Sequence, residues 1–119
     1  PVALTAAAND YGYDVALARQ VRTIQADATT ALIVLSCSGN SRNIISLMDL
    51  FGSMEHVLAR PTVIALTGDL SQPNHADLGA HISVKVASDN YGVIEDVHSV
   101  VIHIIRQLLV DKGLTEPAR

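Results

Sequence analysis

The sequence contains no tryptophan, and only 3% of its residues are aromatic, which disfavours a surface that binds nucleic acids by stacking on their bases. It has no run of lysine and arginine, and its net charge is −4, so it carries no basic footprint for a phosphate backbone. No apolar run is long enough to span a bilayer, and no signal-peptide pattern opens the chain. We therefore expect neither a nucleic-acid partner nor a membrane partner.

The sequence has one cysteine, Cys37, which excludes a disulfide within the chain and fits a reducing, cytoplasmic setting. Hydrophobic residues make up 49% of the 119 residues, and this length is near the usual size of a single domain. The chain begins at Pro1, without an initiator methionine, in what reads as the middle of a structured region. We expect a single domain over residues 1–119 that lacks an N-terminal portion.

Three short apolar runs predict β-strands, and the segments around them predict helices. Each run is apolar along its length, which is typical of strands covered on both faces. Strands that alternate with helices predict an α/β fold, a doubly wound parallel sheet flanked by helices. The predicted strands are Ala31 to Ser36, Thr62 to Thr67 and Ile82 to Val86, and the predicted helices are Tyr13 to Gln25, Asn43 to Met54 and Gly92 to Asp111.

The last predicted helix is the longest, and its apolar residues recur at helical spacing. A single stripe is expected, and Gly113 is expected to end the helix. The stripe consists of Ile94, Val97, Val101, Ile105 and Leu108, and it is widened by Val100, Ile104 and Leu109.

A turn rich in hydroxyl groups, Ser36-Cys37-Ser38-Gly39-Asn40-Ser41, joins the first predicted strand to the following helix. Strand, turn and helix N-terminus together suit an anion, because backbone N–H groups, the helix dipole and serine hydroxyls all favour negative charge. The turn also lies where ligands bind in parallel sheets, beyond the carboxyl ends of the strands. A phosphorylated small molecule is the leading ligand. The alternative is that Ser41 or Asn40 simply caps the helix.

Four segments, in the right order from Leu4 to about Leu109, resemble sugar isomerase (SIS) domains, and among these the phosphoheptose isomerases most closely. The turn is similar to the family's S-T-S-G-N-S loop, and three further segments match. These are Leu4 to Tyr13 (L-T-A-I-A-N-D-Y-G-Y in the family), Val63 to Gly68 (V-I-A-L-T-G) and Ile94 to His98 with His103 (R-I-Q-E-I-H…H). The resemblance implies a flavodoxin-like, SIS-type fold and a homotetramer. It also implies that the family's N-terminal helices, first sugar loop and catalytic glutamate would precede Pro1.

By resemblance, the turn would hold the substrate phosphate. The hydroxyls of Ser36, Ser38 and Ser41 would bind it, and the backbone of Gly39 and Asn40 would complete the cradle. Cys37 stands where the family has threonine, and a thiol is a poorer hydrogen-bond donor than a hydroxyl. We expect a neutral thiol there that fills space, because a thiolate would repel the phosphate.

The resemblance makes His103 the leading catalytic candidate, because a histidine titrates near neutral pH and serves as acid or base. Glu95 lies eight residues earlier, within one quadrant of the same helix. The family commonly has glutamine there, and some members bind zinc through that glutamine and the histidine. Glu95 and His103 are therefore predicted to be catalytic and to form half of an optional Zn²⁺ site. The alternatives are a core histidine and a solvated carboxylate in the first helical turn.

Other polar residues receive weaker assignments. His98 is about 140° around the helix from His103, so it is predicted to be a packing or interface residue. The family often has aspartate where Gly92 stands, and Asp89 or Asn90 could replace that sugar contact.

Two functions remain open on the sequence alone. The first is an aldose–ketose isomerase that acts on sedoheptulose 7-phosphate or a related heptose phosphate through an enediol, with the 119 residues alone inactive. The second is a non-catalytic module that binds a sugar phosphate or recruits a protein, as a relative of the family does with a replication initiator.

Overall fold

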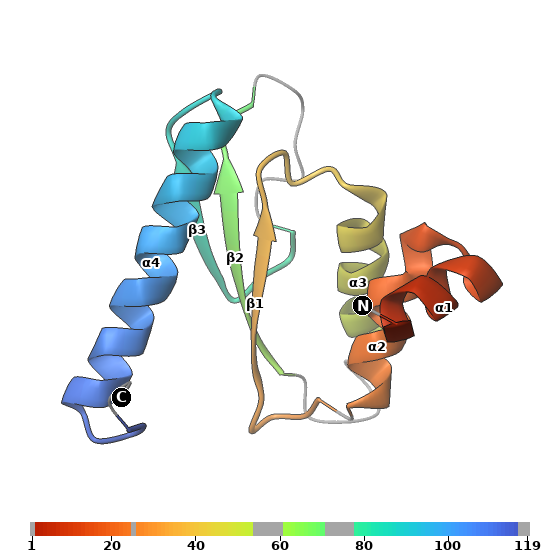
Figure 1. The fold of residues 1–119 in the computed structure, drawn as a ribbon, viewed down its shortest axis with the longest axis horizontal. Coiled ribbons are helices and arrows are strands. Elements are labelled where there is room, and N and C mark those ends of the chain that lie inside the picture. Colours follow the sequence, from red (N-terminus) through yellow and green to blue (C-terminus); the bar gives the residue numbers. More distant parts are fainter. Residues whose placement is uncertain (1, 25, 54–60, 71–77, 117–119) are drawn as a thin grey trace.

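The computed structural model describes residues 2–24, 26–53, 61–70 and 78–116. In these ranges the order of elements is α1 (Val2–Tyr11), α2 (Tyr13–Thr23), β1 (Ala31–Ser36), α3 (Arg42–Ser53), β2 (Thr62–Gly68), β3 (Ile82–Val86) and α4 (Tyr91–Asp111). Figure 1 shows the three strands side by side, with α4 on one side of them and α1, α2 and α3 on the other.

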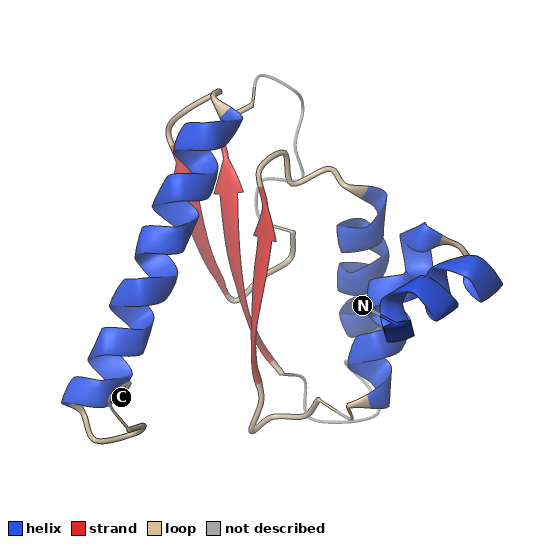
Figure 2. Cartoon of the chain, in the orientation of Figure 1, coloured by secondary structure: helices blue, strands red, loops and turns tan. Residues whose placement is uncertain are grey.

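The three strands form a parallel sheet in the order β1-β2-β3. The register pairs Ser36 with Thr67, and Thr67 with Lys85. Because paired residues of neighbouring strands project to the same face, these three side chains form a row across the sheet at its carboxyl end. Figure 2 shows β1, β2 and β3 pointing the same way, so the segments that follow them share one edge.

The main hydrophobic core lies between the sheet and the pair α2 and α3. Apolar residues of α3 recur at helical spacing and are buried against one face of the sheet. The members of this core are Ala18, Val34, Ile44, Leu47, Met48, Phe51, Val63, Ala65 and Leu78. The parity of Val34 and Ala65 places Ser36 and Thr67 on this same face, the face that α3 covers.

Helix α4 packs on the opposite face, over β2. Leu66 and Ile94 are both fully buried, and α4 and β2 are in contact. The neighbouring side chains of this face, Leu35 on β1 and Val84 on β3, are exposed. One helix is thus too narrow to cover three strands.

The prediction of strands covered on both faces is confirmed for β2, where Ala65 to Gly68 are all buried, and is wrong for β3 and for part of β1. Four of the five residues of β3 are exposed and the fifth is partly buried, and β1 alternates exposed and buried positions over its second half. Apolar composition predicted the strands but not what covers them. The apolar residues of α4 form one broad face, as predicted, but the sheet covers only one side of it. Ile94 faces the sheet, whereas the neighbouring row is exposed, formed by Val93, Val97, Val100, Ile104 and Leu108.

The elements themselves were predicted closely. Strands β1 and β3 have the predicted bounds, β2 extends one residue further to Gly68, and α4 begins one residue earlier at Tyr91. Helix α2 ends at Thr23 instead of Gln25, a residue outside the described ranges, as is Met54 at the predicted end of α3. Helix α1 was not predicted as a helix. It buries no residue, so it lacks the amphipathic stripe that identified the others.

Candidate functional site

The serine turn is held by hydrogen bonds within itself. The N–H of Gly39 donates to the carbonyl oxygen of Ser36 at 3.2 Å and to the Ser36 Oγ at 3.1 Å. The N–H of Asn40 donates to the Ser38 Oγ at 3.2 Å. Gly39 has φ of 66°, a left-handed conformation that glycine adopts without the strain of a side chain. The sequence Ser-Cys-Ser-Gly-Asn therefore encodes this tight turn directly.

The turn leads into the N-terminus of α3. The carbonyl oxygen of Ser41 accepts from the N–H groups of Ile44 and Ile45 at 2.9 and 3.0 Å, so Ser41 is the residue that precedes the first helical turn. The Ser36 and Ser38 hydroxyls accept from the backbone, which leaves the proton of each free to be donated. Hydroxyl protons and a helix N-terminus thus lie together at the carboxyl edge of the sheet, an arrangement suited to an anion.

Strand β2 anchors the turn from beside it. The N–H of Gly68 donates to the Cys37 carbonyl oxygen at 2.9 Å. A Cβ on Gly68 would lie 2.8 Å from that oxygen and would clash with the Cδ1 and Cγ1 of Ile94. Gly68 therefore allows three segments, the turn, the end of β2 and the start of α4, to meet at one point.

Burial and the nearby negative charge of Glu95 raise the pKa of the Cys37 thiol above its ordinary value. Both effects favour the neutral thiol. The expectation of a neutral thiol in the turn is thereby supported, and the influence of Glu95 on Cys37 indicates that the carboxylate lies on the side of α4 near the turn.

The two predicted catalytic residues are both exposed on α4, but they are placed differently. Glu95 lies in the first turns of the helix, near the serine turn. His103 lies roughly 12 Å further along the helix axis and about 180° around it from Ile94. Since Ile94 faces the sheet, His103 points away from it, and the structure does not bring His103 to the serine turn.

The predicted zinc site has two candidate ligands among the described residues. Glu95 and His103 offer the oxygen and nitrogen donors that zinc accepts. Among the residues that the structure describes, no three His, Cys, Asp or Glu side chains come together as a metal ion would require. Among the described residues, Glu95 and His103 therefore form at most half of a zinc site.

His98 is a packing residue, as predicted. Its side chain is only 3% exposed, and its Nε2 atom has no hydrogen-bond partner in the described part of the chain. Asn90 caps α4, because its side chain accepts from the N–H of Val93 at 3.3 Å. That role uses one lone pair of the Asn90 side-chain oxygen and leaves its NH₂ group available to a ligand.

Sequence reasoning places Thr67 at this edge, where the second predicted strand ends, but it did not predict the row that Thr67 forms with Ser36 and Lys85. Thr67 is 1% exposed, and its Oγ1 atom has no hydrogen-bond partner among the described residues. Lys85, next to it in the register, forms an ion pair with Asp69 whose Nζ–Oδ1 distance is 2.7 Å. This row could have been predicted only from the register of the three strands at one edge of the sheet. No single segment of the sequence contains that information.

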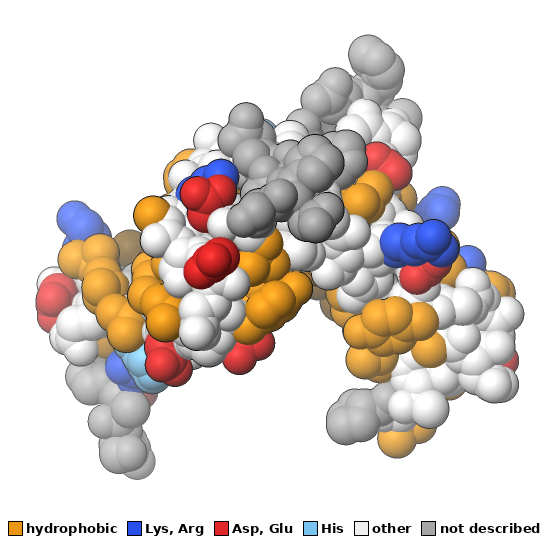
Figure 3. Space-filling model, turned by 90° about the horizontal axis from the view of Figure 1, so that it is seen from above, with side chains coloured by type: hydrophobic (Ala, Val, Ile, Leu, Met, Phe, Trp, Pro, Cys, Tyr) orange, Lys and Arg blue, Asp and Glu red, His pale blue; other side chains and the backbone are white. Residues whose placement is uncertain are grey.

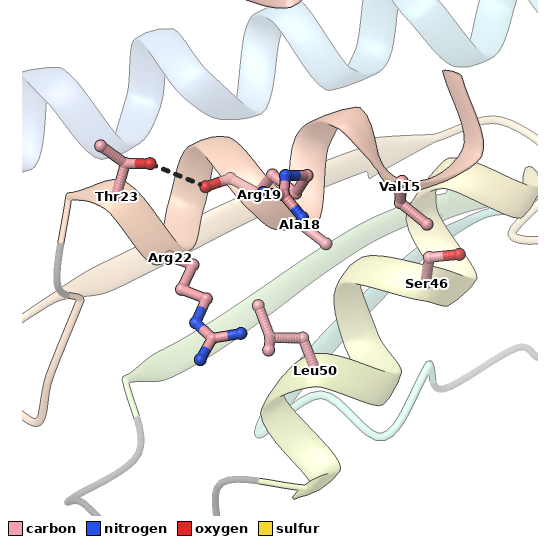
Figure 4. Close-up of a pocket in the computed structure, with 7 residues that line it drawn as sticks. All are labelled: Val15, Ala18, Arg19, Arg22, Thr23, Ser46 and Leu50. Atoms are coloured by element: carbon pink, nitrogen blue, oxygen red, sulfur yellow. Dashed lines mark hydrogen bonds between the residues drawn. The ribbon is translucent and has the colours of Figure 1, made fainter. Parts of the chain in front are cut away.

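A cavity of about 440 Å³ lies elsewhere, between α2 and α3. Figure 4 shows the residues that line it, and the Thr23 hydroxyl donates there to the carbonyl oxygen of Arg19. Its lining contains none of the predicted site residues. It consists of Val15, Ala18, Arg19, Arg22, Thr23, Ser46 and Leu50.

Relatives of known name cover most of this chain. It is 36% identical over 110 residues to a phosphoheptose isomerase of Alteromonas mediterranea and 32% identical over 108 residues to one of Colwellia psychrerythraea. The chain is similar to phosphoheptose isomerases over most of its own length. These alignments include 91% and 89% of the chain but only 52% of each relative, so the chain spans about half their length. No protein-family model matches it.

Solved structures agree with the sequence relatives. A phosphoheptose isomerase from Neisseria gonorrhoeae superposes with a TM-score of 0.75 at 31% identity, covering 91% of this chain and 57% of that one. One from Francisella tularensis gives a TM-score of 0.71 at 29% identity, covering 87% and 51%. The doubly wound, SIS-type arrangement predicted from the sequence is confirmed by these neighbours.

Within the described ranges, none of the helices has the length and apolar character of a membrane span.

Proposed function

We propose that the protein to which this chain belongs is an aldose–ketose isomerase that acts on sedoheptulose 7-phosphate or a related heptose phosphate. The observation that carries this proposal is the serine turn at the carboxyl edge of the sheet, in a chain whose relatives are phosphoheptose isomerases. The turn provides hydroxyl protons, a left-handed glycine and a helix N-terminus in one place, which suits a phosphate.

In the proposed reaction, Ser36, Ser38 and Ser41 bind the phosphate. A base removes the proton from the carbon beside the carbonyl group, and an acid protonates the carbonyl oxygen, which gives an enediol. A proton then adds to the former carbonyl carbon while the hydroxyl on the neighbouring carbon loses its proton, which forms the new carbonyl group and completes the exchange of aldose and ketose. We assign transfer of the carbon-bound proton to His103. We assign proton transfer at the oxygen to Glu95 together with an acid–base group beyond the described residues.

The exposed row on α4 supports a further part of the proposal, a homo-oligomer, as the family resemblance predicts for a tetramer. Val93, Val97, Val100, Ile104 and Leu108 are all more than a third exposed, and Figure 3 shows a broad hydrophobic area on the α4 side of the molecule. His103 is three residues from Val100, so their side chains are neighbours on the helix surface. A subunit that covers this row would therefore also enclose His103.

The oligomer is tested by light scattering on the purified chain and on the double variant Val97→Lys, Ile104→Lys. A lysine at the centre of an apolar contact is costly to bury, so the variant should be monomeric where the unmodified chain is not. Variant Asp111→Lys, outside the row, is the control. A monomeric unmodified chain would contradict the proposal.

The isomerase is tested by proton NMR of the whole protein with sedoheptulose 7-phosphate in heavy water. Deuterium should enter the substrate while aldose appears. His103→Ala should abolish this exchange and leave line broadening of the substrate, a sign of binding, unchanged. Absence of exchange in a protein that binds the substrate would contradict the isomerase and favour the second function, a module that binds sugar phosphate without turnover. The outward direction of His103 is the observation that favours that second function.

Two finer points belong to the same proposal. Glu95 and His103 would be zinc ligands if two more ligands came from outside the described residues, and bound zinc would polarise the carbonyl group. Equilibrium dialysis against Zn²⁺, with Glu95→Gln as the comparison, tests this.

We also propose a cytoplasmic location, supported by a single cysteine that forms no disulfide within the chain.

A further inference from the structure

The candidate site contains one polar group that the proposed function does not use. The Thr67 side chain is 1% exposed, and its Oγ1 atom has no hydrogen-bond partner among the described residues. A buried hydroxyl without a partner is unfavourable, and folded proteins rarely keep one without a reason. The Thr67 hydroxyl therefore needs a hydrogen-bond partner that the described residues do not provide in this arrangement.

The position of Thr67 indicates what that partner is. The register places Thr67 directly beside Ser36, and both side chains project to the face that α3 covers. Ser36 is the residue whose Oγ accepts the N–H of Gly39 at 3.1 Å. A hydroxyl oxygen accepts two hydrogen bonds and donates one. After the bond from Gly39, the Ser36 hydroxyl still has one lone pair and its own proton available.

We propose that Thr67 is a positioning residue of the anion site, whose hydroxyl donates to the Ser36 Oγ when an anion occupies the serine turn. This proposal rests on the proposed phosphate-binding role of the turn. The Ser36 proton is then directed to the anion, and its oxygen accepts from Thr67 on one side and from Gly39 on the other. Hydrogen bonds in such a chain polarise and strengthen one another.

Thr67 acts through Ser36 and does not touch the ligand, because its hydroxyl oxygen is enclosed. The neighbour of Thr67 on the other strand, β3, cannot take the place of Ser36 as an acceptor. Lys85 is next to Thr67 in the register, but its Nζ is engaged by Asp69 at 2.7 Å, and an ammonium group offers no lone pair to accept from a hydroxyl. Within the row, only Ser36 is an acceptor for Thr67.

The proposal predicts effects of opposite sign on folding and on binding. Thr67→Val keeps the shape of the side chain and removes the hydroxyl. In the absence of ligand it should leave the melting temperature unchanged or raise it, because the lost group has no partner. The affinity for inorganic phosphate should fall about fivefold, the effect of losing one ordinary hydrogen bond. A residue that only supports the fold would instead lower the melting temperature and leave the affinity unchanged.

The experiment titrates inorganic phosphate into the chain and follows the amide resonances of Gly39 and Asn40 by NMR, with thermal melts of the same samples. Thr67→Ser, which keeps the hydroxyl, should bind phosphate more tightly than Thr67→Val. Thr62→Val, on the same strand at an exposed position, should bind as the unmodified chain does.

Two results would overturn the inference, and they are distinguishable. Equal phosphate affinity in Thr67→Val and the unmodified chain would exclude the positioning role and leave the proposed function intact. Absence of phosphate binding to the unmodified chain would exclude the anion site itself, and the positioning role with it.

Discussion

Replacing Gly68 by alanine tests the point where the serine turn, β2 and α4 meet. A Cβ at this position would lie 2.8 Å from the Cys37 carbonyl oxygen and would clash with the side chain of Ile94. The carbonyl oxygen belongs to the backbone, and Ile94 is fully buried, so neither neighbour moves freely. Added volume in a packed interior costs about 1–3 kcal/mol. At about 4 °C per kcal/mol for a chain of this size, we expect the melting temperature to fall by roughly 4–12 °C.

Gly52→Ala is the matched control for Gly68→Ala. Gly52 lies in α3, and a Cβ there meets no atom within 4 Å. Alanine at an exposed helical position is better than glycine by roughly 0.5–1 kcal/mol, so this variant should melt slightly higher than the unmodified chain. Thermal unfolding followed by circular dichroism measures both variants. If Gly68→Ala melts at or above the temperature of Gly52→Ala, the tight contact between the turn, β2 and α4 is refuted.

Three further predictions concern the same region. Asn90→Ala removes the cap of α4 and should cost about 1 kcal/mol in the free energy of unfolding, whereas Asn90→Asp should restore most of it; equal urea midpoints for all three proteins would contradict the cap. The pKa of Cys37 is raised in the folded chain, so its contribution to stability is complete below the ordinary thiol pKa of about 8.5 and is lost as the pH rises through the folded value. The unmodified chain should therefore lose more stability than Cys37→Ser above that pH, and parallel pH profiles would contradict this. Ser38→Ala should weaken phosphate binding about fivefold, the loss expected for one hydrogen bond, and an unchanged titration of the Asn40 amide would exclude Ser38 from the site.

The sequence was sufficient to predict the elements that have strong periodicity or a special residue. Strands β1 and β3 have the predicted bounds, because each is a short apolar run bounded by turn residues, and such a length favours a strand over a helix. The serine turn was predicted from Gly39 between serines, and the structure places a left-handed glycine there. Helix α1 was missed because its alanine-rich sequence buries nothing, and periodicity detects only helices that have a buried face.

The arrangement of the site could be predicted only in part, because periodicity gives angles around a helix and not the face that docks. Helix α4 has one broad apolar face, and the sequence did not tell which side of that face packs on β2. With Ile94 on the sheet, His103 faces away from it. The row of Ser36, Thr67 and Lys85 was likewise beyond sequence reasoning, because it depends on the register between strands that are far apart in the chain.

The separation of Glu95 and His103 along α4 bears on how the proposed substrate would lie. In a sugar phosphate the carbonyl group and the phosphate are at opposite ends of the carbon chain, so a group that acts on the carbonyl end should stand away from the phosphate cradle. His103, roughly 12 Å further along the helix than Glu95, satisfies that requirement in distance, whereas Glu95, near the turn, does not. His103 does not satisfy it in direction, because it faces the side of α4 next to Val100 and not the sheet. The exposed row and the direction of His103 therefore have one common explanation. In the proposed homo-oligomer, a second subunit that covered Val93, Val97, Val100, Ile104 and Leu108 would also complete the surroundings of His103, so assembly and catalysis would depend on each other.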